Sequence, residues 1–132
     1  MHRILQPEGW KRPAGYANGI AASGRQVFVA GQVGWDGQQR LVSDDFIAQV
    51  GQALRNIVVV LEEGGARPEH IARMTWYVLD RDEFNARFAE IGPVYREVLG
   101  PVFPAMSVVQ VSALLEHAAK VEIEVTAVVP DP

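Results

Sequence analysis

The 132-residue sequence contains no cysteine, which excludes disulfides, thiolate nucleophiles and sulfur-ligated metal sites. It also lacks the long apolar run that a membrane-spanning helix needs, so we expect a soluble protein with no membrane partner. The N-terminus, Met-His-Arg-Ile-Leu-Gln-Pro, has no apolar signal core followed by a cleavage site, and we therefore expect a cytoplasmic location. Repeats and linkers are also missing, which favours one domain over residues 1–132.

Basic residues are too few and too scattered for a nucleic-acid-binding surface. Twelve Lys and Arg stand against sixteen Asp and Glu, which gives a net charge of −4 and a pI near 5.3. The arginines fall singly along the chain, a pattern typical of solvated surface charge. We therefore expect no nucleic acid partner, and small molecules or further copies of the chain are the expected partners.

Metal and cofactor motifs are missing as well. His2, His70 and His117 lie far apart in the sequence, and none forms the helical pair typical of a metal site. No serine stands in a nucleophile elbow, and the spacing of Gly31 and Gly34 differs from a dinucleotide fingerprint. The sequence thus predicts neither a metal nor a cofactor.

An apolar share of 48% with 21% charged residues is typical of a folded chain, and its first third indicates strands. The segment Gln-Val-Phe-Val-Ala-Gly is rich in β-branched and aromatic residues. We predict a strand pair formed by Tyr16 to Ala22 and Gln26 to Gly31, with the turn at Ser23-Gly24.

Two helices are predicted. Ser43 is the expected cap of a helix from Asp44 to Glu63, because apolar residues then recur at helical spacing until Gly64. A second helix opens at Asp80, where Glu83 completes a capping-box pattern. Pro93 removes one helical hydrogen bond, so we expect this helix to kink or break near Ile91-Gly92.

Strands alternate with these helices. Ile71 to Val78, Ala105 to Val111 and Lys120 to Val129 are rich in strand-forming residues. The predicted order is β-β-α-β-α-β-β, which implies an α/β two-layer sandwich with a mixed sheet and both helices on one face.

Two helices cover only one face of such a sheet, so the other face needs a partner. In the last strand the apolar set Val121, Ile123, Val125 and Ala127 is expected to meet the helices, whereas Glu122 and its alternates point away. We expect Met106, Val108 and Gln110 to lie on the uncovered face, and this semi-polar surface predicts a homo-oligomer.

Glu122 is the candidate catalytic residue. A carboxylate flanked by Val121 and Ile123 is costly to bury unless it meets a partner or a cavity, and a partly desolvated carboxylate serves as a general acid or base. The alternative is an interface carboxylate paired with an arginine of a neighbouring subunit. Trp35 follows the strand that ends at Gly31 and is a candidate for the mouth of a pocket.

These residues carry a family resemblance. The stretch Phe-Pro-Ala-Met-Ser-Val-Val-Gln-Val from Phe103, followed after a loop by Val121-Glu122-Ile123, resembles the C-terminal signature of the RidA (YjgF/YER057c/UK114) family. In that signature Phe-Pro-Ala-Arg-Ser precedes an apolar strand. Upstream, Ala14-Gly15-Tyr16 resembles the Gly-Pro-Tyr opening of the family, and the similarity runs in order to Val129.

The resemblance implies a chorismate-mutase-like fold, a homotrimer and ligand clefts between subunits. Members with the full motif hydrolyse enamines and imines, such as 2-aminoacrylate, without a cofactor. By this resemblance Glu122 assists the attacking water, Tyr16 is the site tyrosine and Gly31 contributes its backbone.

The chain departs from the family at Met106, where the deaminases have the arginine that binds the substrate carboxylate. Ala30 replaces a serine, Val108 a residue that is often cysteine, and an asparagine of the second helix is replaced near Gly92. Losing a bidentate charge-assisted pair costs at least about tenfold in affinity. Arg25 and Arg73 are candidates to replace the missing arginine in binding the substrate carboxylate.

Three functions stay open: an imine or enamine hydrolase with an altered substrate, a non-catalytic metabolite-binding trimer, and a ribonuclease or translation inhibitor, which the acidic charge disfavours.

Overall fold

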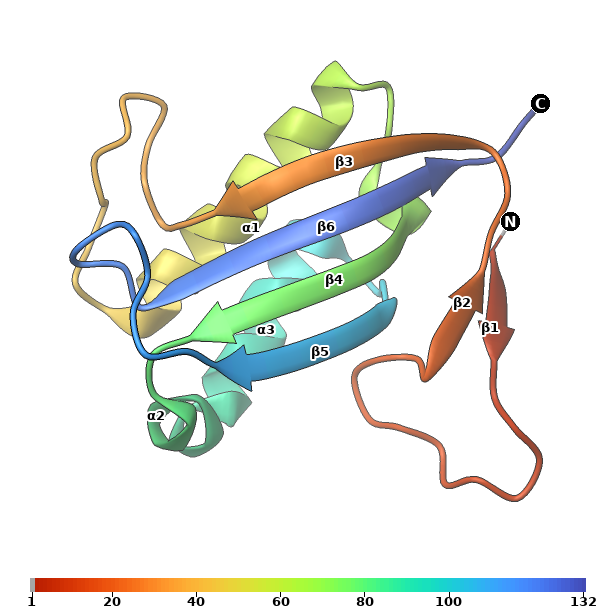
Figure 1. Cartoon of the computed structure of the whole chain (residues 1–132), viewed down its shortest axis with the longest axis horizontal. Helices are drawn as coiled ribbons and strands as arrows, with labels where there is room; N and C mark the ends of the chain where they lie inside the picture. The colour runs from red at the N-terminus through yellow and green to blue at the C-terminus, as the bar shows by residue number, and fades with distance from the viewer. Residues whose placement is uncertain (1) are drawn as a thin grey trace.

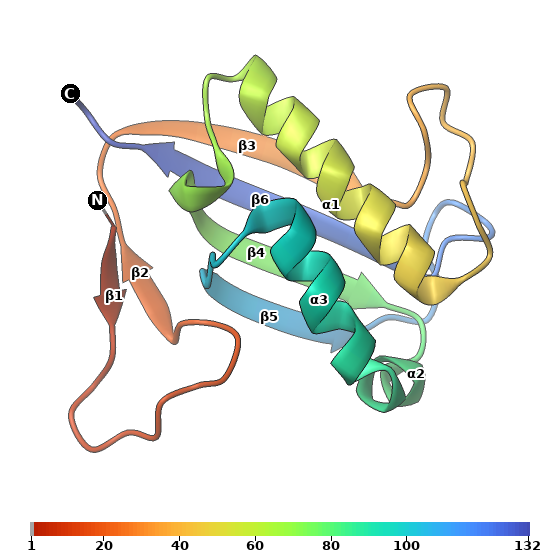
Figure 2. The same cartoon turned by 180° about the vertical axis from the view of Figure 1, so that it is seen from behind.

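The computed structural model describes residues 2–132 and shows a four-stranded sheet with helices packed on one face (Figures 1 and 2). In chain order the elements are β1 (Arg3–Leu5), β2 (Gly19–Ala21), β3 (Arg25–Gln32), α1 (Phe46–Glu63), a 3₁₀ turn (Pro68–His70), β4 (Ile71–Val78), α2 (Arg81–Ala86), α3 (Phe88–Leu99), β5 (Ala105–Gln110) and β6 (Val121–Val129). The predicted two-layer α/β architecture is confirmed. Within the described residues, no helix is long and apolar enough to cross a membrane.

The sheet has the order β3-β6-β4-β5. β4 and β5 run parallel, while β6 is antiparallel to both of its neighbours, so the sheet is mixed as predicted. The parallel pair is joined through α2 and α3, which is the crossover that two parallel strands require. β4 and β6 are the two inner strands.

The predicted hairpin between residues 16–22 and 26–31 is wrong. β2 pairs instead with β1 in a separate two-stranded sheet, and β3 pairs with β6. Gly24 explains the difference, because its φ of 141° and its close approach to the Val129 carbonyl suit a glycine where the chain passes from one sheet into the other. Ser23-Gly24 is therefore a link between two sheets.

α1 begins two residues later than predicted and has a different cap. The Asp45 carboxylate accepts a hydrogen bond from the Ala48 amide at 3.0 Å, whereas the Ser43 hydroxyl accepts one from the Asp45 amide at 2.9 Å. Arg87 also donates to Asp45 at 2.7 Å. This hydrogen bond and the capping interaction hold the pKa of Asp45 below its ordinary value.

The second predicted helix is divided, but at Arg87 rather than near Ile91-Gly92. Asp80 caps α2 as expected, and α3 then continues through Pro93. The Arg87 guanidinium binds Asp45 and Glu90, which holds the junction of α2 and α3 against the start of α1. The change of direction therefore falls at this anchored residue, upstream of the proline.

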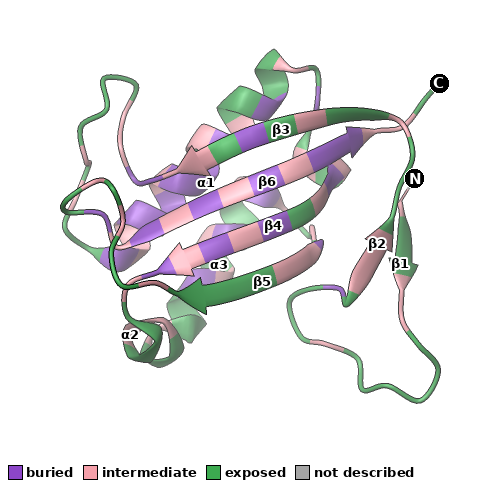
Figure 3. Cartoon of the chain, in the orientation of Figure 1, coloured by how far each residue is buried: buried purple, intermediate pink, exposed green. Residues whose placement is uncertain are grey.

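The core lies between the helices and one face of the sheet. Val121, Ile123, Val125 and Ala127 of β6 are buried against the helices, as predicted, and Figure 3 shows the alternation of buried and partly exposed residues along this strand. β5, at the edge, is largely exposed. The opposite face of the sheet carries no helix (Figure 1) and is called the open face below.

Gln49 fixes the start of β6 near the candidate site. Its side chain is fully buried, and its amide nitrogen donates to the carbonyls of Ser43 and Ala118. Its amide oxygen accepts from the Lys120 amide at 2.8 Å. A buried amide with all these partners is stabilising rather than costly, and it holds the strand that carries Glu122 in register with α1.

Candidate functional site

Glu122 and Gly31 lie against each other on the open face. The pairing of β3 with β6 is irregular between Val29 and Gln32, which places Gly31 in a bulge. A Cβ atom at Gly31 would overlap the Glu122 carboxylate, so only glycine leaves room for this side chain. Bulges commonly redirect a functional side chain, and here the bulge brings a carboxylate against the Gly31 backbone.

The rest of the open face is polar around Glu122. The Tyr77 hydroxyl donates to the Glu124 carboxylate at 2.5 Å, and this bond raises the pKa of Tyr77 above its ordinary value. Arg73 and Ala30 line a shallow depression beside Glu124. The open face therefore presents carboxylates, a phenol and a guanidinium, which is too much charge for a closed core and a plausible set of groups for an interface or a cleft.

Met106 and Val108 lie on the helix side of the sheet, so the expectation that they belong to the uncovered face is wrong. β5 pairs with β4 in a register that sets Met106 beside Met74 and Val108 beside Trp76. Paired residues of neighbouring strands point to the same face, and Met74 and Trp76 are buried under the helices. Met106 is only partly buried because β5 is an edge strand that the helices cover incompletely.

A cavity of about 200 Å³ lies between α3, α2 and β5, and we call it the Met106 cavity. It is lined by Ala14, Gly15, Trp76, Phe84, Phe88, Ile91, Gly92, Tyr95, Arg96, Phe103, Met106 and Val108. Its lining is apolar and aromatic, with one charged side chain, Arg96. The Tyr95 hydroxyl is not free, since it donates to the Val102 carbonyl at 2.6 Å, and burial raises the pKa of Tyr95.

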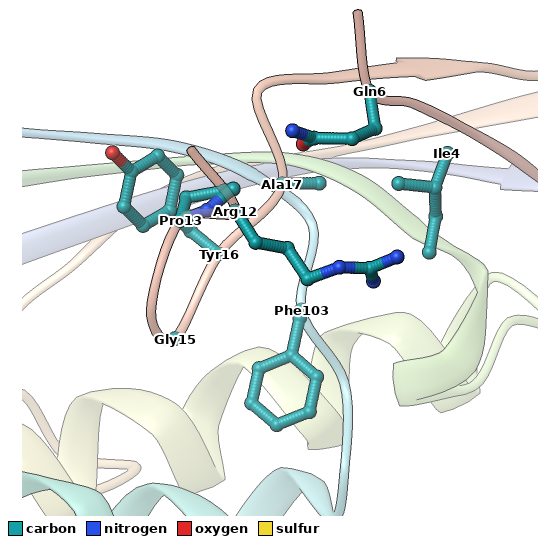
Figure 4. A pocket seen from close by; sticks show the side chains of 8 residues that line it. All are labelled: Ile4, Gln6, Arg12, Pro13, Gly15, Tyr16, Ala17 and Phe103. Carbon is teal, nitrogen blue, oxygen red and sulfur yellow. The ribbon is translucent and has the colours of Figure 1, made fainter. Parts of the chain in front are cut away.

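Tyr16 lies in a third place, on the long connection between β1 and β2. The Ala17 amide donates to the Pro104 carbonyl at 2.9 Å and thereby fixes this connection beside the start of β5. Tyr16 is 41% exposed and lines a pocket with Arg12 and Phe103. Figure 4 shows that the Arg12 side chain extends between Phe103 and Ile4 in this pocket, with the Tyr16 hydroxyl on the side away from Ile4.

The backbone of Trp35 is held against α1. Its carbonyl accepts a hydrogen bond from the Asn56 side chain of α1 at 2.8 Å, and its backbone bridges to Leu41. Asn56 also donates to the Val33 carbonyl. These hydrogen bonds fix the loop that follows β3 against α1, and the expectation that the Trp35 side chain borders a pocket stays a prediction.

The predicted site residues thus form separate groups within one chain. Glu122 and Gly31 lie together on the open face with Ala30 nearby, whereas Met106 and Val108 share the cavity on the helix side. Sequence reasoning did not identify Arg96 as a site residue. One feature of the sequence points to Arg96: it follows Gly92 by four residues, and residues at this spacing share a helix face. Gly92 is the position near which the family's asparagine is replaced.

The described residues offer no obvious metal site. Within residues 2–132, no group of three or more His, Asp or Glu side chains is placed to hold a metal ion. His2 and His70 do lie together, since the His2 ring is 2.8 Å from the His70 carbonyl, but this contact joins the N-terminus to the turn before β4. The arrangement around Glu122 supports acid–base chemistry by a carboxylate.

A model of the family described as Endoribonuclease L-PSP matches residues 10–129. A RutC family protein from Haemophilus influenzae is 32% identical over 130 residues, which cover 97% of this chain and 98% of the relative. The human 2-iminobutanoate/2-iminopropanoate deaminase is 29% identical over 105 residues, covering 79% of this chain and 73% of the human protein.

Among solved structures, the fold is similar to that of YyfB from Yersinia pestis, described as a protein of unknown function of the conserved Rid protein family. The TM-score is 0.82 at 33% identity, and the match covers 97% of this chain and 98% of the other. The similarity therefore extends over nearly the whole fold, including the strands that carry Glu122 and Met106.

Proposed function

Because the chain belongs to the Endoribonuclease L-PSP family, which includes the Rid proteins, we propose that it hydrolyses a small imine or enamine without a cofactor. The observation that carries this proposal is the contact of the Glu122 carboxylate with Gly31. A carboxylate held beside the backbone of a glycine is suited to activate water while that backbone orients a substrate. The name of the human relative, an imine deaminase, supports the same reaction class.

In the proposed reaction Glu122 accepts a proton from the water that attacks the carbon of the C=N bond and passes it to the nitrogen, which gives a carbinolamine. Glu122 then takes the proton of the carbinolamine hydroxyl and delivers it to the nitrogen as the C–N bond breaks, and the products are a carbonyl compound and ammonia. Because Gly31 has no side chain, it leaves room for the Glu122 carboxylate beside the backbone. Tyr16 borders the substrate. Met106 and Val108 line the part of the cleft that takes the substrate side chain.

The proposed site is shared between copies of the chain. Glu122 faces the open side of the sheet and Met106 the helix side, so one chain cannot direct both at one small substrate. We propose a homotrimer in which the open face of one subunit meets the β5 edge of the next. Exposed apolar groups on the open face, Phe28 at 70% and Val109 at 43%, support such an interface.

Glu122→Gln is the direct test of the reaction. Imines generated in situ from amino acids by an amino-acid oxidase serve as substrates, and ammonia release is followed with and without the protein. We expect Glu122→Gln to lower kcat by roughly 10²-fold or more, since this is the ordinary contribution of a general acid–base group. Glu62→Gln on the exposed surface of α1 is the control. Equal rates for Glu122→Gln and the unaltered protein would remove the catalytic role.

A non-catalytic metabolite-binding trimer is the second candidate. One observation favours it: the lining of the Met106 cavity contains no carboxylate or imidazole, and its one hydroxyl, that of Tyr95, is bonded to the Val102 carbonyl, so this cavity alone is suited to bind without reacting. Stoichiometric ligand retention without turnover on any imine would select this function. The ribonuclease that the family description suggests fits poorly with the net charge of −4.

A further inference from the structure

The walls of the Met106 cavity select an apolar side chain. Phe84 packs edge-on against Trp76, with ring centroids 6.1 Å apart, and it also contacts Phe88 at 5.8 Å. Met106 and Val108 form the sheet side of the same cavity. An apolar cavity of ~150 Å³ is large enough to admit benzene, so the volume of about 200 Å³ accommodates a ring or a branched chain with a short extension.

Arg96 is the charged group of this cavity. It lies one helical turn after Gly92 on α3, and long side chains on helices lean back over the preceding turn. A Cβ at Gly92 would lie 3.4 Å from Arg96 Nη1, so the guanidinium rests over the glycine that lines the cavity. The ion pairs of the described residues involve other arginines, namely Arg40, Arg67, Arg81 and Arg87. Arg96 therefore keeps its donors for a ligand.

A second unused donor belongs to Trp76. Its side chain is 2% exposed, and within residues 2–132 its indole Nε1 is the one buried side-chain nitrogen or oxygen without a hydrogen-bond partner. Such an orphan donor is costly unless a ligand or water supplies an acceptor. A guanidinium and an indole N–H both bind oxygen acceptors. Because the lining carries no acid, the cavity favours an anion over a neutral or cationic ligand.

The two arginines considered from the sequence are engaged elsewhere. Arg25 donates to the Gly64 carbonyl at 2.8 Å, at the far end of β3. Arg73 lies on the open face beside Glu124, across the sheet from Met106. Arg96, on a helix rather than on β5, is thus the arginine that shares a cavity with Met106.

We infer that Arg96 binds the carboxylate of a substrate whose apolar side chain fills the Met106 cavity. The substrate class is then the 2-imino acids derived from larger apolar amino acids, with aromatic or branched side chains. As a statement about a substrate this rests on the proposed function, but the binding of an apolar carboxylate is measurable without turnover. With Met106 in place of the arginine that the deaminases have on this strand, the cavity has more room for an apolar group, and Arg96 of α3 supplies the positive charge.

Binding of three stable probes to the purified full-length protein tests this inference. 3-Phenylpropanoate has the ring and the charge, 3-phenylpropanamide has the ring alone, and propanoate has the charge alone; each is titrated calorimetrically. Arg96→Gln removes the cation, and Arg81→Gln makes the same change at a side chain that is 77% exposed and lies outside the cavity lining. Both variants change a surface-accessible side chain, so folding is preserved and is checked by circular dichroism.

We expect the unaltered protein to bind 3-phenylpropanoate more tightly than either other probe. Arg96→Gln is expected to weaken 3-phenylpropanoate binding by roughly tenfold and to leave the amide unchanged, because only the charge-assisted bonds are lost. Arg81→Gln is expected to change neither. Equal affinity for the carboxylate and the amide, or an equal loss of both in Arg96→Gln, would overturn the inference.

These titrations, taken together with the ammonia-release assay of Glu122→Gln, separate this inference from the proposed reaction. Arg96-dependent binding in a protein that hydrolyses no imine supports the carboxylate site and rejects the hydrolase. Glu122-dependent hydrolysis together with Arg96-independent binding supports the hydrolase and rejects the role of Arg96.

Discussion

Met106 and Glu122 point to opposite faces of one sheet. Met106 on β5 lies beside Met74 of β4, which is buried under the helices. Glu122 on β6 lies beside Tyr77, which is also on β4 but points to the open face. β4 also separates β5 from β6. A site that uses both residues therefore needs two copies of the chain, and several consequences of this arrangement are measurable.

Gly31→Ala is expected to disturb Glu122. The added Cβ overlaps the Glu122 carboxylate, and overpacking of this kind costs about 1–3 kcal/mol. Urea unfolding at one fixed protein concentration measures the loss, and ammonia release measures the accompanying drop in activity. Gly37→Ala is the matched control, since a Cβ at Gly37 meets nothing within 4 Å. If both substitutions had the same small effect, the contact between Gly31 and Glu122 would be without consequence.

Asp45 is expected to stabilise the protein in a pH-dependent way. Asp45→Ala removes both the cap of α1 and the Arg87 contact and costs about 1–2 kcal/mol, whereas Asp45→Asn keeps a capping oxygen and costs less than about 1 kcal/mol. The folded-state pKa of Asp45 lies below the ordinary value of 3.8. The contribution of the charge is therefore fully present above 3.8 and is lost as the pH falls through the lower folded value.

Thermal or urea unfolding at a series of pH values checks this sign. The difference between the unaltered protein and Asp45→Asn is expected to narrow on acidification. A difference that grew at acid pH would mean that the charge of Asp45 is unfavourable in the folded state.

Phe28→Asp is expected to weaken the assembly. Phe28 is 70% exposed in one chain, so its replacement removes little from the subunit core, but it places a charge on the proposed interface. Val59→Asp on α1 is the control, because Val59 is 65% exposed on the helix side. Light scattering after size exclusion is expected to show a trimer for the unaltered protein and for Val59→Asp, and smaller species for Phe28→Asp. If the unaltered protein were a monomer, the proposal of a site shared between subunits would be wrong.

Met106→Arg is expected to change substrate preference. The new guanidinium enters the Met106 cavity, where it adds a carboxylate partner and fills apolar volume. We expect kcat/KM to rise for the short enamine 2-aminoacrylate and to fall for imines of aromatic amino acids, by roughly tenfold in each direction. Met106→Leu keeps the apolar lining and serves as the control. An unchanged preference would mean that Met106 does not line the substrate pocket.

The elements with agreeing local signals were predictable from the sequence. α1 was placed within two residues of its observed start because apolar spacing and the terminal glycines agree, although Asp45 and not Ser43 is the cap. The alternation in β6 correctly identified the residues that meet the helices. The strand pair around Ser23-Gly24 was wrong because the true partners of β2 and β3 lie elsewhere in the chain, and local turn signals carry no information about such pairing.

The candidate site was less predictable, for a similar reason. A strand period shows that Met106 and Val108 share a face, but on a partly exposed edge strand it does not show which face. Arg96 is one of many isolated arginines in the sequence, and only the packing of α3 over β5 brings it to the Met106 cavity. By contrast, Glu122 was identified because a carboxylate between two buried apolar residues conflicts with its surroundings.

The most direct test of the shared site is complementation between two impaired chains. Glu122→Gln removes the carboxylate, and Val108→Trp fills the Met106 cavity; the two chains are co-expressed with different tags, and mixed trimers are purified and verified by native mass spectrometry. If Glu122 and the cavity come from different subunits, each trimer that contains both chains has one site with both intact partners, which is about a third of its sites. We therefore predict recovery of about a third of the unaltered activity, well above either variant alone. Mixed trimers with no more activity than the two single variants would contradict a site built from Glu122 of one subunit and the Met106 cavity of the next.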